Sequence, residues 1–254
     1  MKVAFVGPSL WGEIEHGSFA PAPSVIIRPP AAQGDIFAAV KDGATVIGLI
    51  DGLYENVAAP WHKEILFALQ SGVAILGGAS LGALRAAECA AFGMIGVGRI
   101  FDDYAKERRI DDSDVAQIHS PTELGSFPLS AALVNVDATI DRAGLAGVLS
   151  DEERTALPKI ARSIFFKDLT LDSVASAFYD DKQRARDLGE RLSRHWIDQK
   201  RIDARQLMDA MESMPDEMSR VRLSWQMRES GIWMAFTAAE RRNALATNEG
   251  SSPS

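Results

Sequence analysis

Residues 73–92 decide the fold, and they read VAILGGASLGALRAAECAAF. The apolar run Val73–Leu76 is typical of a buried strand, and it stops at two glycines. The Ala-rich run Leu81–Phe92 predicts a helix that ends before Gly93. A strand that passes directly into a helix is the building unit of a parallel sheet.

The sequence before this stretch repeats the same pattern. Val3–Val6 is an apolar run that ends at a Gly-Pro pair, and Ala44–Ile50 is another that ends at Asp51-Gly52. Residues 59–71 predict a helix that leads into the strand at Val73. None of these strands alternates apolar and polar residues, which is expected where both faces of a sheet are covered. We therefore predict an α/β fold with a parallel sheet and right-handed crossover helices in the N-terminal half.

The middle of the chain offers two more candidate strands, Val115–His119 and Leu133–Val136. The glycines of Gly93–Gly98 lack the strand-then-helix context of a dinucleotide-binding turn, and the chain has no Walker pattern. We therefore predict no nucleotide cofactor.

The C-terminal half is predicted to be mainly helical. Apolar residues recur there at helical spacing in Glu152–Phe166, Leu171–Phe178, Lys182–Gln199, Asp203–Met214 and Met218–Arg228. The composition changes near Gly144–Gly147, since six arginines precede this point and 13 follow it. We predict an α/β domain at residues 1–145, a helical region at 146–247 packed on or beside it, and a disordered polar tail at 248–254.

Composition narrows the class of protein. The 254-residue chain has 27 basic and 35 acidic residues, a net charge of −8 and a single cysteine, Cys89. The acidic balance argues against a nucleic-acid partner. One cysteine excludes an internal disulfide, and the isolated histidines predict no metal site. No apolar run reaches the length of a membrane span, and the N-terminal run is too short for a signal peptide. We expect a cytoplasmic protein without a membrane partner, and a homo-oligomer is compatible with the sequence.

Polar residues follow each of the three predicted N-terminal strands. The first strand delivers Ser9, the second delivers Asp51 and the third delivers Ser80. The helix after the second strand carries Lys63 in its first turn. The carboxyl ends of parallel strands share one edge of a sheet, where binding sites gather. We therefore predict that these residues line one cleft.

The segment around Ser80 matches a nucleophile elbow. Gly78-Ala79-Ser80-Leu81-Gly82 is a G-x-S-x-G pattern between a strand and a helix. Gly78 and Gly82 permit a tight turn that exposes the Ser80 hydroxyl, and the N–H of Leu81 is a natural donor to an oxyanion. The alternative is a glycine-rich turn in which Ser80 only caps the helix.

A serine nucleophile needs a base, and Lys63 is the best-placed candidate. A helix start and a desolvated site both lower the pKa of a lysine, and Ser–Lys pairs are a known variant of the catalytic triad. The alternative for Lys63 is a solvated surface lysine. His119 and His195 are the other candidate bases, and neither lies at a convincing strand end. Asp51 could orient Lys63 or bind a donor group of the substrate, and the alternative is a turn residue before Gly52. Ser9 could contribute a hydroxyl to the site or cap a helix.

Several motifs, taken together and in order, resemble the TfuA-like family. They are VGPSL at 6–10, IDG at 50–52, HKEIL at 62–66, GASLGALRAAE at 78–88, FGMIGVGRIFDDY at 92–104 and DDSDVAQIHSP at 111–121. The resemblance covers roughly residues 1–140. The family commonly has Met where this chain has Leu81, and the backbone N–H is the same in both.

The resemblance implies a partner of a YcaO enzyme, which uses ATP to convert a backbone amide of a ribosomal precursor peptide into a thioamide. It implies that the TfuA-like partner takes sulfur from a thiocarboxylated ThiS-like carrier at a Ser–Lys site and strengthens binding between the YcaO enzyme and the peptide. Carried onto this chain, the serine is Ser80 and the lysine is Lys63, whereas Asp51 and Ser9 receive no role. We expect a thiocarboxylate hydrolase without a cofactor. The alternatives are a non-catalytic adaptor and a small-molecule serine esterase.

Overall fold

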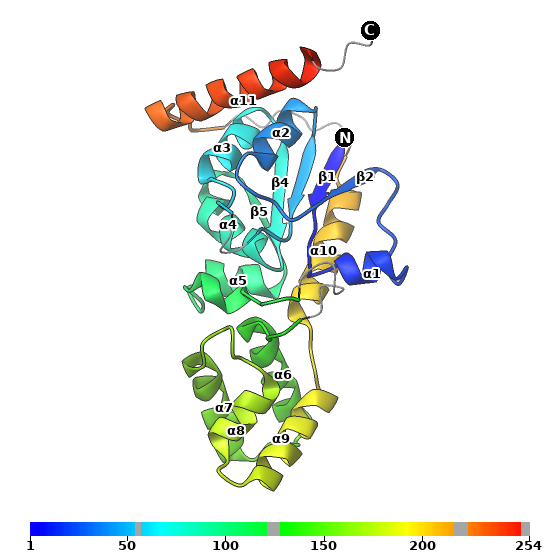
Figure 1. Cartoon of the computed structure of the whole chain (residues 1–254), viewed down its shortest axis with the longest axis vertical. Coiled ribbons are helices and arrows are strands. Elements are labelled where there is room, and N and C mark those ends of the chain that lie inside the picture. The colour runs from blue at the N-terminus through cyan, green and yellow to red at the C-terminus, as the bar shows by residue number, and fades with distance from the viewer. Residues whose placement is uncertain (54–56, 121–127, 216–222, 250–254) are drawn as a thin grey trace.

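A computed structural model describes residues 1–53, 57–120, 128–215 and 223–249 (Figure 1). Its centre is a five-stranded sheet in the order β2-β1-β3-β4-β5, and every strand pairs in parallel with its neighbours. The strands are β1 (Lys2–Phe5), β2 (Val25–Arg28), β3 (Val46–Leu49), β4 (Ala74–Gly78) and β5 (Ile95–Val97). The predicted α/β class with a parallel sheet is confirmed.

The sequence analysis identified the three central strands and missed both edge strands. β2 is partly exposed and ends in an arginine, and β5 has only three residues with a glycine in the middle, so neither is buried throughout as β1, β3 and β4 are. Residues 93–98 were expected to lack a strand and a following helix. That expectation was wrong, because they contain β5 and lead directly into α5 (Arg99–Ala105).

The two faces of the sheet are covered by different parts of the chain. Phe5, Leu49 and their alternating neighbours face α2 (Asp35–Lys41), α3 (His62–Gln70) and α4 (Leu81–Cys89). The intervening residues, such as Ala4, face α10 (Gln199–Ser213), which comes from the C-terminal half. β1, β3 and β4 are therefore buried on both faces, as their unbroken apolar runs predicted.

Helix α10 runs antiparallel to the strands. At its end, the Lys2 ammonium donates to the carbonyl of Met214 at 2.6 Å, beside the start of β1. Leu207, in the middle of the helix, fills the space beside Gly78 at the end of β4. The first turn of α10 therefore extends past the carboxyl edge of the sheet.

Four helices form a separate group beyond this edge, and they share a core of their own (Figure 1). They are α6 (Leu133–Leu145), α7 (Asp151–Ser163), α8 (Leu171–Phe178) and α9 (Lys182–Arg194). The group thus begins before the change of composition at residues 144–147. The strand expected at Leu133–Val136 was wrong, because these residues form the first turn of α6. A four-residue apolar run is too short for its period to separate a strand from a helix.

Two other expected elements also differ from the structure. Val115–His119 forms no named strand, since η2 (Asp112–Val115) is a 3-10 turn and His119 makes only an isolated bridge to Pro128. The expected helix Met218–Arg228 is absent over the described residues 223–228, and its first five residues lie outside the described residues.

The last helix, α11 (Gly231–Glu249), packs across α2 and α3 (Figure 1). Its Trp233 is buried against Phe37 and Phe67, and Phe236 lies against Trp61. The helix includes the first two residues of the tail expected at 248–254, and the remaining five lie outside the described residues. The other short elements are α1 (Trp11–Glu15) and η1 (Ala90–Phe92).

Candidate functional site

The carboxyl edge of the sheet has a topological switch point between β1 and β3. The chain leaves β1 for β2 on one side and later returns to β3 on the other, so the loops after β1 and β3 diverge and leave room for a ligand. Ser9 and Asp51 lie here, and both are buried. The hydroxyl of Ser9 donates to Oδ1 of Asp51 at 2.6 Å, and Oδ2 of Asp51 accepts the N–H groups of Gly7 and Ser9. The structure thus brings these two predicted residues together, and three hydrogen bonds fix the Asp51 carboxylate.

Ser80 lies one strand further along the same edge, at the start of α4. Ala79, immediately before it, has a φ of 65°, so the backbone turns sharply between strand and helix. Position 82 requires glycine because a Cβ there would collide with the carbonyl of Leu49. The Ser80 side chain makes no capping hydrogen bond to α4, which leaves its hydroxyl available for another partner.

Gly78 and Leu81, two further residues of the predicted site, lie on either side of Ser80 in the sequence. Gly78 is the last residue of β4, where it pairs with Val97. Leu81 is the first residue of α4, and within the described part of the chain no acceptor is present for its N–H. An unpaired amide at a helix start is suited to bind a developing negative charge.

Lys63 points to a different environment from the one expected. Its ammonium donates to the carbonyl of Arg228 at 2.8 Å, in an exposed contact with the segment before α11. No hydrogen bond joins Lys63 to Ser80 or Asp51 in the described residues. The assignment of Lys63 as the base stays a prediction.

A second lysine, which no sequence pattern predicted as a site residue, lies at this edge. Lys200, in the first turn of α10, is buried, and its ammonium donates to the carbonyl of Val115 at 2.9 Å. Its backbone N–H donates to Oδ1 of Asn135 in α6. Burial lowers the pKa of Lys200, against the opposing effect of the Asp51 and Asp198 carboxylates. Asp51 is thus close enough to Lys200 to act on its charge.

His119 also lies near this cluster, although it follows no strand. Burial and the nearby Lys200 charge lower the pKa of His119, and the Asp51 charge raises it. His119 is not at the end of a strand of the sheet, as its sequence context indicated. Its position near Lys200 could not be predicted from a periodic pattern, because the segment before His119 has irregular structure.

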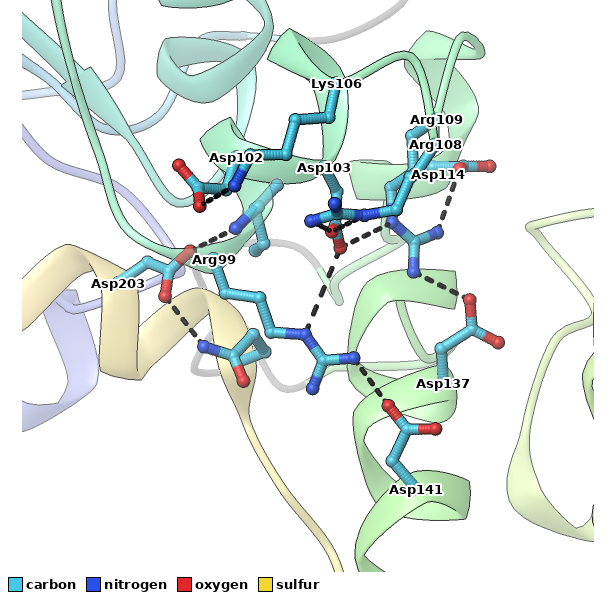
Figure 2. A network of polar contacts seen from close by, with 12 residues as sticks. Arg99, Asp102, Asp103, Lys106, Arg108, Arg109, Asp114, Asp137, Asp141 and Asp203 are labelled. Atoms are coloured by element: carbon cyan, nitrogen blue, oxygen red, sulfur yellow. Dashed lines mark hydrogen bonds and ion pairs between the residues drawn. The ribbon is translucent and has the colours of Figure 1, made fainter.

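A second polar cluster joins α5 to the helical group (Figure 2). The buried Arg109 guanidinium binds Asp114 at 2.9 Å and Asp137 at 2.7 Å, and its Nε lies 3.6 Å from Asp103. Arg162 of α7 also reaches Asp137. Among the described residues, Arg109 Nε and Asp137 Oδ1 are buried without a hydrogen-bond partner. Because every charge here has an opposite charge beside it, we interpret this cluster as the structural link between the two parts of the chain.

Two pockets flank Arg109 and Arg162, and neither is lined by Ser80, Asp51 or Lys200. The described residues contain no group of three or more His, Cys, Asp or Glu side chains that could hold a metal ion. Within the same ranges, no helix is both long and apolar enough to span a bilayer.

Comparison with known proteins supports a family. A family model described as TfuA-like protein matches residues 51–170. The matched range holds Asp51, Lys63, Ser80 and His119, whereas Ser9 and Lys200 lie outside it. A search of curated proteins finds no match. Residues 51–170 of this chain therefore match the TfuA-like family, in agreement with the ordered motifs and the parallel sheet.

Proposed function

We propose that this protein hydrolyses the thiocarboxylate of a ThiS-like sulfur carrier and supplies the released sulfide to a partner YcaO enzyme. The TfuA-like family is associated with YcaO-dependent thioamidation. The observation that carries the proposal is the uncapped Ser80 hydroxyl at the start of α4, beside the unpaired N–H of Leu81. A serine that only capped the helix would accept a hydrogen bond from a first-turn amide through its side-chain oxygen.

The chemistry asks for a strong oxyanion site. A thiocarboxylate, C(=O)S⁻, is a poor electrophile because its negative charge is shared between sulfur and oxygen. In the proposed reaction the Ser80 oxygen attacks the carbonyl carbon, and the N–H of Leu81 at the start of α4 stabilises the tetrahedral oxyanion. Collapse breaks the C–S bond and releases HS⁻, which carries the proton lost by Ser80. Water then cleaves the acyl-enzyme and returns the carrier as a carboxylate.

A lysine is the proposed proton acceptor. The family resemblance implies Lys63, which would first have to give up its hydrogen bond to the Arg228 carbonyl. The amine accepts the Ser80 proton during attack and gives it to the departing sulfur.

Sulfide released in free solution would diffuse away from its point of use. We therefore propose that the protein acts in the cytoplasm while docked on the YcaO enzyme, which holds the precursor peptide. Local release then raises the effective sulfide concentration at the second site.

Sulfide release from a thiocarboxylated ThiS-like carrier tests the proposal. We expect Ser80→Ala to lower the rate by at least about 1,000-fold, since loss of a nucleophile removes the covalent step. Ser71→Ala is the matched control, because its exposed hydroxyl donates only to the Phe67 carbonyl in the last turn of α3. No release by a folded wild-type protein would favour the adaptor, which would still enhance peptide binding by the YcaO enzyme. Turnover of simple esters without release from the carrier would favour the esterase.

A further inference from the structure

We propose that Lys200, contributed by the C-terminal half of the chain, is the amine partner of Ser80 at the carboxyl edge of the sheet. This inference rests on the proposed function, and it names a different lysine from the one that the family motif supplies.

The contacts of α10 fix the height of Lys200 relative to Ser80. Leu207 fills the space beside Gly78, and Ala204 shares a buried cluster with Ala79. Lys200 is one helical turn before Ala204, and Ser80 is the residue after Ala79. Because α10 packs against β4, Lys200 and Ser80 lie at the same edge of the sheet, Ser80 in the turn after β4 and Lys200 in the first turn of α10.

The surroundings hold the Lys200 ammonium in place without using all of its donors. The carbonyl of Val115 accepts one N–H, and no second acceptor for the ammonium is present in the described residues. Asp51 and Asp198 act on it electrostatically, and neither forms a hydrogen bond with it. His119 is the remaining titratable group whose charge couples to Lys200.

This environment suits a base. A neutral amine has two N–H bonds and one lone pair, so the Val115 carbonyl can orient the amine by accepting one N–H while the lone pair stays free. Burial lowers the pKa of Lys200, which increases the neutral fraction near pH 7. The exposed contact of Lys63 with the Arg228 carbonyl supplies no comparable desolvation.

The proton transfer balances within the proposed reaction. As the bond between the Ser80 oxygen and the carbonyl carbon forms, the hydroxyl proton moves to Lys200. When the C–S bond breaks, the same proton leaves with sulfur as HS⁻, and Lys200 returns to its neutral form.

Four variants test the assignment: Lys200→Met, Lys200→Arg, Lys63→Met and Lys2→Met. Lys2→Met is the matched control, because Lys2 is also buried and donates to carbonyls at the opposite end of α10. We expect both Lys200 variants to lower sulfide release by about 100-fold or more, the usual contribution of a general base. Arginine keeps the positive charge and cannot accept a proton at neutral pH, so it separates a base from a charge that only holds the structure.

A second readout does not need the carrier. A fluorophosphonate forms a bond to the Ser80 oxygen and expels fluoride, so its rate of labelling reports how nucleophilic the serine is. We expect labelling to rise with pH as Lys200 loses its proton, and we expect Lys200→Met to abolish that dependence while circular dichroism stays native. His119→Gln, measured in the same way, shows whether the imidazole carries the pH dependence instead.

The outcomes separate this inference from the proposed function. If Ser80→Ala keeps full activity, the proposed function itself fails. If Ser80→Ala is inactive while Lys200→Arg or Lys200→Met retains activity, the Lys200 assignment is overturned and the serine hydrolase stands. Loss in Lys63→Met alone returns the role to Lys63, and loss in His119→Gln alone assigns it to the imidazole.

Discussion

Helices α3 and α10 begin at the same edge of the sheet, and each has a lysine and an acidic residue near its start. The two acidic residues have the same role, whereas the two lysines do not. α3 starts with Lys63 and Glu64, and α10 carries Lys200 and then Asp203. Both acids are fully buried. Glu64 accepts the N–H of Gly34 at the start of α2, and Asp203 accepts the N–H of Ile100 at the start of α5.

The two lysines differ because their surroundings differ. Lys63 lies on the outer side of α3, where the contact with the Arg228 carbonyl remains exposed. Lys200 is enclosed by η2, α6 and the end of the sheet. A buried helix start always needs an acceptor for its free N–H groups, so the acids share one role. A lysine ammonium can be satisfied by a backbone carbonyl, and tertiary packing decides whether that contact is exposed to solvent, as for Lys63, or buried, as for Lys200.

Removal of either acid should have the largest effect on stability. We expect Glu64→Ala and Asp203→Ala each to lower the free energy of unfolding by about 3 kcal/mol, because buried N–H donors lose their charged acceptor. Chemical denaturation measures the change. Glu190→Ala, which removes an exposed partner of Arg194, is the control and should stay within about 0.5 kcal/mol of wild type. A loss below about 1 kcal/mol for Asp203→Ala would contradict a shared capping role.

The pH dependence of stability should reveal the burial of these acids. Burial raises the pKa of both Glu64 and Asp203. A raised pKa in the folded state favours the protonated acid, so this contribution is complete below the unfolded pKa and is lost as pH rises through the folded pKa. Relative to Asp203→Asn, wild type should therefore lose stability as pH rises across that window, by about 1.4 kcal/mol for each pH unit between the unfolded and the folded pKa. Denaturation at a series of pH values measures this difference, and a constant difference would mean that burial leaves the pKa unchanged.

Unlike removal of the acids, removal of either lysine should not destabilise the protein strongly. We expect Lys63→Met to change stability by no more than about 0.5 kcal/mol, as for other surface substitutions. Lys200→Met should leave stability unchanged or raise it by about 1 kcal/mol, since an apolar side chain replaces a buried amine that donates to a single carbonyl. Thermal unfolding at pH 7 provides the test. A strong loss of stability in Lys200→Met would indicate a structural ion pair with Asp51.

The smallest expected effect distinguishes the two faces of the sheet. Burial raises the pKa of Cys89 to about 11, so its thiol should react slowly with iodoacetamide. Cys89 packs in the same cluster as Ile65 of α3, on the face opposite α10. Under native conditions Glu64→Ala should therefore speed alkylation several-fold more than Asp203→Ala. Equal rates would show that the two faces open together.

Much of the candidate site follows from strand ends, which local sequence marks well. Ser9, Asp51 and Ser80 each follow a central strand within four residues, so the parallel sheet places them at one edge. The glycines around Ser80 also have the predicted purpose, since Gly82 allows α4 to approach the carbonyl of Leu49. These features depend on a few neighbouring residues, and a short stretch of sequence contains them all.

Lys200 and His119 could not be found in the same way. The periodicity placed Lys200 between two expected helices, whereas α10 begins at Gln199. Its burial depends on contacts with Val115 and Asn135, which are 85 and 65 residues away. His119 reaches the edge from an irregular segment with no period to detect.

The sequence by itself determined the α/β class, the family motifs and the three polar residues at the ends of central strands. The tertiary structure alone decided that α10 returns to cover the second face of the sheet, that Lys63 binds an exposed carbonyl and that Lys200 is buried at the edge. The physical reason is the distance in sequence over which each effect acts. Strand and turn signals arise from adjacent residues, whereas desolvation of a charge depends on every element that packs around it.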